Sequence, residues 1–190
     1  LNHKNSYTGN TYSSEEKIIA YEVFNEPNLP KDVEAIKQYV NTTVKVFFFV
    51  WITKPIFFNI SENPGKEQWE GVAASNIDGV SFQWYPTGLV KYSKLNGNYL
   101  PHVLNYQFPD LTDKLKNKAK IVYEFDAADI GTSIMYPVMA HSFREAGMQW
   151  ATMFCYDPTP IAQFNSEYST HYLNLLYTPQ KALGFLIASN

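Results

Sequence analysis

Two glutamates stand at the ends of apolar segments, where a folded chain could present them to a ligand. Glu26 follows the apolar run 18–24 and directly precedes Pro27, which has no backbone N–H and cannot extend a strand ladder. Glu124 stands near the end of a second such run, residues 120–126. Two carboxyl groups on the ends of parallel strands can act as a general acid and a nucleophile. This is the chemistry that we expect at these positions.

The elements that must position these residues alternate between strand and helix. Apolar segments that begin near residues 18, 55, 77, 121 and 148 predict five strands. Nearly all are continuous apolar runs, which is typical of an α/β protein whose parallel sheet is covered by helices. Helices are predicted from about residue 31 and over about 66–74, 111–119, 133–145 (ended by Gly147) and 171–188, the last interrupted at Pro179. The stretch 44–52 fits a helix end, an extra strand or a core strand, and we favour 55–60 as the core strand.

The composition is that of a globular chain. Its 190 residues, 45% hydrophobic and 17% charged, suffice for one domain, which we expect to span 1–190. The net charge is −3 without a basic stripe, and the longest apolar run, 46–52, is too short for a bilayer, so neither nucleic acid nor a membrane is an expected partner. Cys155 is the single cysteine, which excludes an internal disulfide and a Cys-based zinc site. No Gly-rich loop follows a strand, so a Rossmann enzyme is not favoured, and we expect no cofactor and no metal.

The tripeptide Asn25-Glu26-Pro27 at a strand end, followed by the strand-end Glu124, resembles the retaining glycoside hydrolases of clan A, most closely the family 5-like members. That resemblance implies a TIM (β/α)8 barrel with an acid/base Glu after strand four and a nucleophile Glu after strand seven. If Glu26 marks strand four, the strand count places Glu124 on strand seven. The chain would then be the C-terminal part of a catalytic domain, an incomplete barrel of about five βα units, strands 4–8. We expect three more units before Leu1 and an unstable or incompletely active chain without them.

The resemblance implies a role for each matching residue. Glu26 would be the acid/base, Glu124 the nucleophile, and Asn25 a hydrogen-bond partner of the sugar 2-hydroxyl. Tyr85 ends the strand before that of Glu124, and its phenol could donate to the Glu124 carboxylate and keep it ionised and aimed. The alternatives are surface glutamates in loops, a turn-capping Asn25 and a rim aromatic at Tyr85.

The expected partner is a carbohydrate, an oligo- or polysaccharide. Trp84 and Tyr156 could stack on sugar rings, although core or rim positions fit them equally. Asp157 follows a strand end and could bind sugar hydroxyls, as could Glu62, Asp126 and Asp129, although a loop-capping or solvated role fits each of them. Further domains of a longer chain are possible partners, and a polysaccharide-degrading enzyme would be secreted or periplasmic.

Two other functions fit part of the pattern. A carbohydrate-binding barrel without catalytic activity would keep the aromatic and polar rim, but the presence of both carboxylates argues against it. A metal-dependent barrel, such as a sugar isomerase, could use Glu26, Glu62 and Glu124 as oxygen ligands for a hard cation. It would leave the Asn-Glu-Pro tripeptide unexplained, and no His stands at a strand end.

Overall fold

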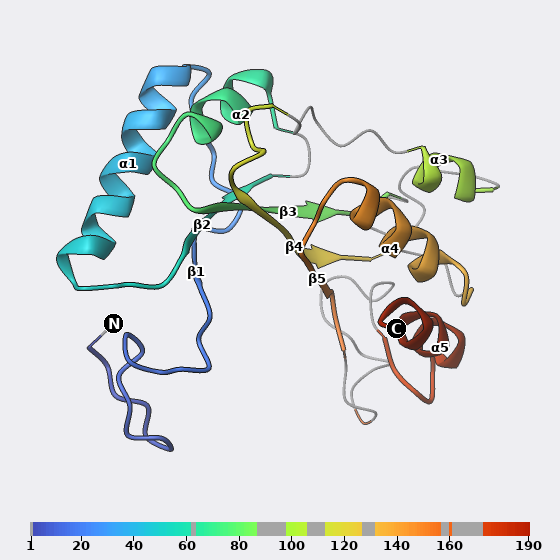
Figure 1. Ribbon diagram of the computed structural model, residues 1–190. Helices are drawn as coiled ribbons and strands as arrows, with labels where there is room; N and C mark the ends of the chain where they lie inside the picture. Colours follow the sequence, from blue (N-terminus) through green and yellow to red (C-terminus); the bar gives the residue numbers. More distant parts are fainter. Residues whose placement is uncertain are drawn as a thin grey trace. The chain divides into compact units, whose positions relative to one another are not determined.

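The computed structural model is an α/β fold in which strands and helices alternate along the chain (Figure 1). The structure describes residues 2–61, 64–86, 98–105, 113–126, 132–156, 160 and 173–190. Its elements are β1 (Tyr21–Val23), α1 (Val33–Phe49), β2 (Ile56–Ile60), α2 (Lys66–Ala73), β3 (Gly79–Trp84), α3 (Leu100–Leu104), β4 (Ala119–Phe125), α4 (Met135–Glu145), β5 (Trp150–Met153) and α5 (Pro179–Ala188).

The strands form one five-stranded parallel sheet in the order β1-β2-β3-β4-β5. All residues of β2 and β3 are buried, including the polar residues Asn59, Ser81 and Gln83, whereas β5 is mostly exposed. The predicted α/β class and the parallel sheet are therefore confirmed. The chain divides into two compact units: unit 1 comprises Leu1–Ser81 and Thr112–Ala119, and unit 2 comprises Phe82–Leu111 and Lys120–Asn190.

In unit 1, α1 packs against α2, β1 lies beside β2, and α2 contacts β2. The side chain of Asp32 caps α1 by accepting a hydrogen bond from the Ala35 N–H at 2.9 Å. Ile36, Val40 and Val44 recur at helical spacing and are all buried. Because this buried face continues at helical spacing, the helix extends to Phe49. Most of the ambiguous stretch 44–52 is therefore helix.

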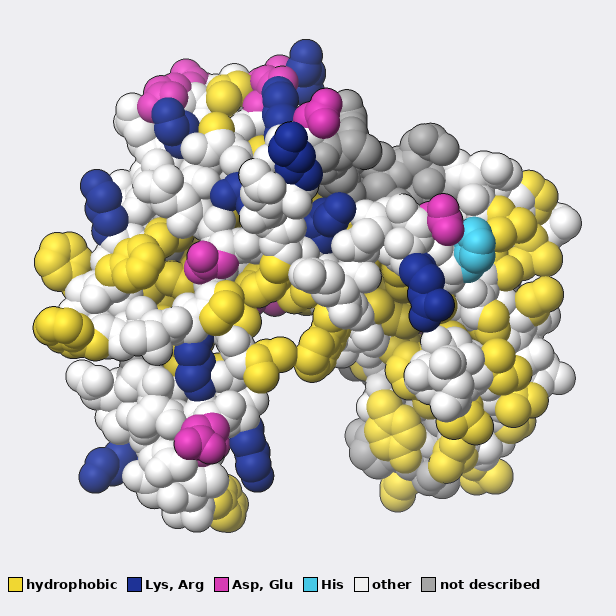
Figure 2. Space-filling model, in the orientation of Figure 1, with side chains coloured by type: hydrophobic (Ala, Val, Ile, Leu, Met, Phe, Trp, Pro, Cys, Tyr) yellow, Lys and Arg dark blue, Asp and Glu magenta, His cyan; other side chains and the backbone are white. Residues whose placement is uncertain are grey.

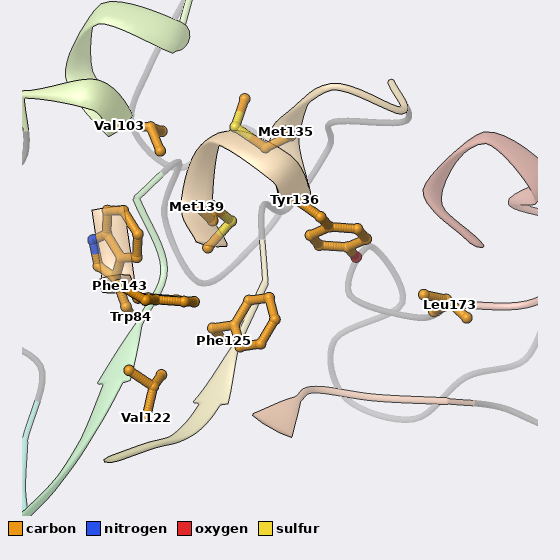
Figure 3. Packing of buried hydrophobic residues seen from close by; sticks show 9 residues of the cluster. All are labelled: Trp84, Val103, Val122, Phe125, Met135, Tyr136, Met139, Phe143 and Leu173. Atoms are coloured by element: carbon orange, nitrogen blue, oxygen red, sulfur yellow. The ribbon is translucent and has the colours of Figure 1, made fainter. Parts of the chain in front are cut away.

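Unit 2 is held together by a cluster of mostly aromatic and sulfur-containing side chains (Figure 3). The ring of Phe143 on α4 packs edge-on against Trp84 and Phe125, with centroid distances of 5.2 and 5.1 Å. The helix α5 packs against α4. Gly184 makes this possible, because any larger side chain there would collide with the Ser133 carbonyl.

Three helix predictions need correction. Residues 113–118 form turns rather than a helix, and β4 already begins at Ala119. The closing helix starts only at Pro179, because a proline is favoured in the first helical turn and residues 175–177 form a turn held by Asn174. The short helix α3 lies in a segment for which the sequence predicts neither a helix nor a strand. The predicted end of α4 is confirmed, since Gly147 adopts a φ of +71° just beyond it.

Figure 2 shows Lys and Arg side chains interspersed with Asp and Glu on the visible face. Within the part of the chain that the structure describes, none of the helices combines the length and the apolar character that crossing a membrane would require.

Candidate active site

In unit 1, Glu26 lies in the loop that leaves the end of β1. Val23 is buried as the last residue of the strand, and the Asn25 and Glu26 residues that follow are exposed. Phe24 and Glu26 have φ angles of +62° and +46°, a left-handed conformation that residues with a side chain rarely adopt. The loop thus holds an unusual backbone while it leaves the predicted acid/base and its neighbour open to solvent.

The backbone of this loop is tied to Asn59, which is fully buried on β2. The Glu26 N–H donates to the Asn59 side-chain oxygen at 2.7 Å. The parallel register pairs Val23 with Phe58, so Asn59 lies one residue beyond the end of β1, beside the departing loop. The sequence contains a signal for this role, because Asn59 is an amide within the apolar run 55–60, but the partner depends on the strand register.

The nitrogen of the Asn59 side-chain amide takes part in further hydrogen bonds. This nitrogen lies 3.2 Å from the hydroxyl of Ser81 and 3.5 Å from the Ser81 carbonyl oxygen, and the hydroxyl donates to the Glu22 carboxylate. Glu22 pairs with Phe57 in the sheet, and alternate residues of a strand share a face, so Glu22 and Asn59 lie on the same side. Three strands therefore contribute one polar network to this face of unit 1.

Burial raises the pKa of the Glu22 carboxyl above its ordinary value, and the hydrogen bonds from Ser81 and Asn59 oppose this rise. The residue as a whole is exposed, but its carboxyl end lies against the fully buried Ser81. The carboxyl group is therefore the buried part of this side chain, which explains its raised pKa, and it is also the last group of the hydrogen-bond network.

In unit 2, the structure brings Tyr85 and Glu124 together. Glu124 is the penultimate residue of β4 and is half-buried, and Tyr85 directly follows β3 and is 2% exposed. The Tyr85 hydroxyl hydrogen-bonds to the Glu124 carboxylate. Burial raises the pKa of Tyr85 far above its usual range, and the negative charge of Glu124 and the hydrogen bond to it add to this rise. Tyr85 is thus a neutral phenol that donates to a carboxylate.

Two residues further on, Asp126 forms a buried ion pair. It is fully buried, with the Lys181 ammonium of α5 at 2.9 Å and the Tyr136 hydroxyl of α4 at 2.6 Å. The Lys181 nitrogen also lies 5.9 Å from the centre of the Tyr136 ring. Burial, followed by the charge of Asp126 and the hydrogen bond to it, raises the pKa of Tyr136. Asp126 therefore ties two helices to the end of β4 and is not open to a sugar.

The remaining predicted binding residues have separate places. Trp84 is 1% exposed and belongs to the core of unit 2, so the prediction that it stacks on a sugar is corrected. Tyr156, after β5, is 60% exposed and bridges to the backbone of Leu173. Asp157 lies outside the described residues, as do Glu62 and Asp129.

Among the described side chains, no three His, Cys, Asp or Glu residues converge as a metal-ion site would require. No protein-family model matches the sequence, and a comparison with curated proteins finds no match. The function therefore has to be inferred from the residues of each unit.

Proposed function

We propose that the chain is part of a retaining glycoside hydrolase in which Glu124 is the nucleophile and Glu26 the acid/base. The observation that carries the proposal is the hydrogen bond between Tyr85 and Glu124. A nucleophilic carboxylate has to stay ionised and keep one orientation, and a buried phenol that donates to it favours both. Glu124 is only half-buried, so its carboxylate can still meet a ligand.

Unit 1 adds support for the acid/base. Glu26 is exposed in a loop at the carboxyl end of β1, and a buried side chain holds its backbone N–H. An acid/base has to change protonation state in each cycle, so contact with solvent and substrate suits it. In retaining enzymes the acid/base and the nucleophile carboxyl groups lie roughly 5–5.5 Å apart.

The proposed reaction proceeds in two displacements. The Glu26 carboxylic acid gives its proton to the glycosidic oxygen as the bond from that oxygen to the anomeric carbon breaks, and the Glu124 carboxylate attacks the carbon to form an ester. The first product leaves as an alcohol. Water then attacks the same carbon and gives a proton to the Glu26 carboxylate, while the ester bond to Glu124 breaks and the sugar leaves with its original configuration.

The fold is compatible with a finer assignment. We propose that β1 to β5 correspond to strands four to eight of a (β/α)8 barrel, in which active sites lie at the carboxyl ends of the strands. Both glutamates stand at or just beyond the carboxyl end of their own strand. The substrate would be an oligo- or polysaccharide, with Asn25 on the sugar 2-hydroxyl and Tyr156, which is exposed, as a further binding residue. Asp157 keeps its predicted role in binding sugar hydroxyls. A secreted or periplasmic location would suit such a substrate.

The first test is turnover of a panel of aryl β-glycosides by the whole protein, with the anomeric configuration of the first product followed by NMR. We expect hydrolysis with retention, loss of turnover in Glu124→Gln, and undiminished activity with a chelator present. Binding of oligosaccharides without turnover would show a recognition module instead, and inversion of configuration would contradict the assignment of Glu124. Loss of activity with the chelator would favour a metal-dependent enzyme.

A further inference from the structure

We propose that Asn59 is the positioning residue of the general acid: it fixes the peptide group before Glu26, and Ser81 and Glu22 fix Asn59. The inference rests on the proposed role of Glu26 and extends it to a side chain that touches neither substrate nor reacting atoms. The resemblance to clan A did not point to Asn59.

The hydrogen bonds around Asn59 allow only one orientation of its amide. Its oxygen accepts from the Glu26 N–H at 2.7 Å, so its nitrogen faces Ser81 and must donate. The Ser81 hydroxyl accepts this bond and gives its own proton to the Glu22 carboxylate. A flipped amide would set two N–H donors against each other, so the network selects the acceptor that Glu26 needs.

Burial makes this selection effective. Asn59 and Ser81 are each 0% exposed, so water cannot replace a partner that is lost. If the Ser81 hydroxyl is removed, the nearest atom of that residue that can accept from the Asn59 nitrogen is its carbonyl oxygen, at 3.5 Å. The Asn59 nitrogen would then keep its hydrogen bond to the Glu22 carboxylate but lose its shorter bond to Ser81, so its hold on Glu26 would weaken.

The hydrogen bond matters for catalysis because of the backbone that it fixes. The peptide group between Asn25 and Glu26 directs both side chains, and Glu26 has a φ of +46°, which a free loop would rarely keep. An acid that has moved by about 1 Å can lose about 10²-fold in rate. The loss should fall on the step in which the leaving group needs a proton.

That dependence on the leaving group is the readout that a purely structural role would not produce. A dinitrophenolate leaves without protonation, whereas an alkoxide does not, so impaired acid catalysis spares the activated substrate. The test compares kcat/KM for a dinitrophenyl glycoside and for the matching alkyl glycoside in Asn59→Ala, Ser81→Ala and Ser81→Thr. Glu26→Ala is measured alongside as the reference for a missing acid.

Asn41 provides a matched control in the same unit. Its side-chain oxygen accepts the Asn76 N–H at 2.7 Å, the same kind of bond at the same length as that between Asn59 and Glu26. Asn41→Ala should leave the ratio of the two kcat/KM values unchanged.

We expect Asn59→Ala to lose about 10²-fold on the alkyl glycoside and only a few-fold on the dinitrophenyl glycoside. Ser81→Ala should show a smaller loss in the same direction, and Ser81→Thr, which keeps the hydroxyl, should restore the ratio. Equal losses on both substrates in folded Asn59→Ala, or in Ser81→Ala if Asn59→Ala does not fold, would overturn the role of Asn59. If Glu26→Ala itself shows no dependence on the leaving group, Glu26 is not the acid, and the proposed function falls with the inference.

Discussion

Two carboxylates, Glu22 in unit 1 and Asp126 in unit 2, have their charge accommodated in different ways. Asp126 is 0% exposed and has a lysine ammonium at 2.9 Å as well as a phenol. The partners that the structure shows for Glu22 are neutral donors, the Ser81 hydroxyl and the Asn59 amide, and burial raises its pKa. A full counter-charge permits complete burial of an ionised group, whereas neutral donors compensate for burial only in part.

The two networks also hold different parts of the chain. The Asp126 network joins α4 and α5 to the end of β4, so it ties whole elements together. The Glu22 network ends on one backbone N–H in a loop, that of Glu26. We therefore expect changes in the first to reduce stability and changes in the second to alter activity.

The largest expected effect is that of Lys181→Met. It would leave the Asp126 carboxylate buried without its ammonium partner, and breaking a buried pair in this way costs about 3–5 kcal/mol. Urea unfolding followed by circular dichroism measures the change. The double variant Lys181→Met with Asp126→Asn, which removes both charges, should recover part of the loss. A single variant that unfolds within about 1 kcal/mol of wild type would show that the pair does not hold α5 in place.

Next in size is the effect of Tyr85→Phe on catalysis. The phenol donates to Glu124, and a hydrogen bond to a charged group contributes about 1.5–3 kcal/mol, so kcat/KM should fall by about 10- to 100-fold. Tyr136→Phe is the matched control, because it removes a similar phenol from a neighbouring buried carboxylate. The control should lower stability, with a much smaller effect on kcat/KM measured below its unfolding temperature. Equal losses of kcat/KM in the two variants would contradict the view that Glu124 is catalytic and Asp126 only structural.

A smaller effect is expected from Glu22→Gln on the pH dependence of stability. Because the folded pKa of Glu22 is raised above its ordinary value of 4.5, the folded state holds this proton more tightly than the unfolded state. The resulting stabilisation is fully present below about pH 4.5 and is lost as the pH rises through the folded pKa. Glutamine does not ionise, so the variant should lose less stability than wild type as the pH rises from about 4.5. Parallel curves of unfolding free energy against pH would contradict the raised pKa.

The smallest effect on stability is expected from breaking the ion pair between Lys37 and Glu34 on α1. Comparing this pair with that of Lys181 and Asp126 shows how much burial contributes. The atoms of the first pair are 3.1 Å apart, close to the distance in the buried pair, but the Glu34 side chain is exposed and that of Lys37 is only partly buried. Glu34→Gln should change the free energy of unfolding by less than about 0.5 kcal/mol. A change as large as that of Lys181→Met would mean that burial is not what separates the two pairs.

Much of the fold could be predicted because the spacing of apolar residues along the sequence indicates which faces of an element are buried. The apolar run of β2 predicted a strand that is buried on both faces, and all its residues are buried. The stretch 44–52 stayed ambiguous because its Val and Phe residues favour a strand locally, while the spacing of Ile36, Val40 and Val44 continues the helix. That competition is decided by packing against the rest of unit 1.

The site could be predicted only in part. Tyr85 and Glu124 stand at adjacent strand ends in the predicted order, so their contact could be anticipated. Trp84 was misassigned because the sequence does not show which side of a strand end faces the core. Asn59 and Lys181 were missed because each is a polar residue in an apolar element, and their partners, Glu26 and Asp126, lie far away in the sequence and are set by register and helix packing.

The central claim is that Glu124 forms a covalent bond with the sugar. The most direct test is to inactivate the whole protein with a 2-deoxy-2-fluoro glycoside, whose second displacement is slow, and to map the labelled peptide by mass spectrometry. Our account predicts one added sugar per chain on the peptide that contains Glu124, and no label in Glu124→Gln. A label on another carboxylate, or turnover of the reagent with inversion and no label, would contradict it.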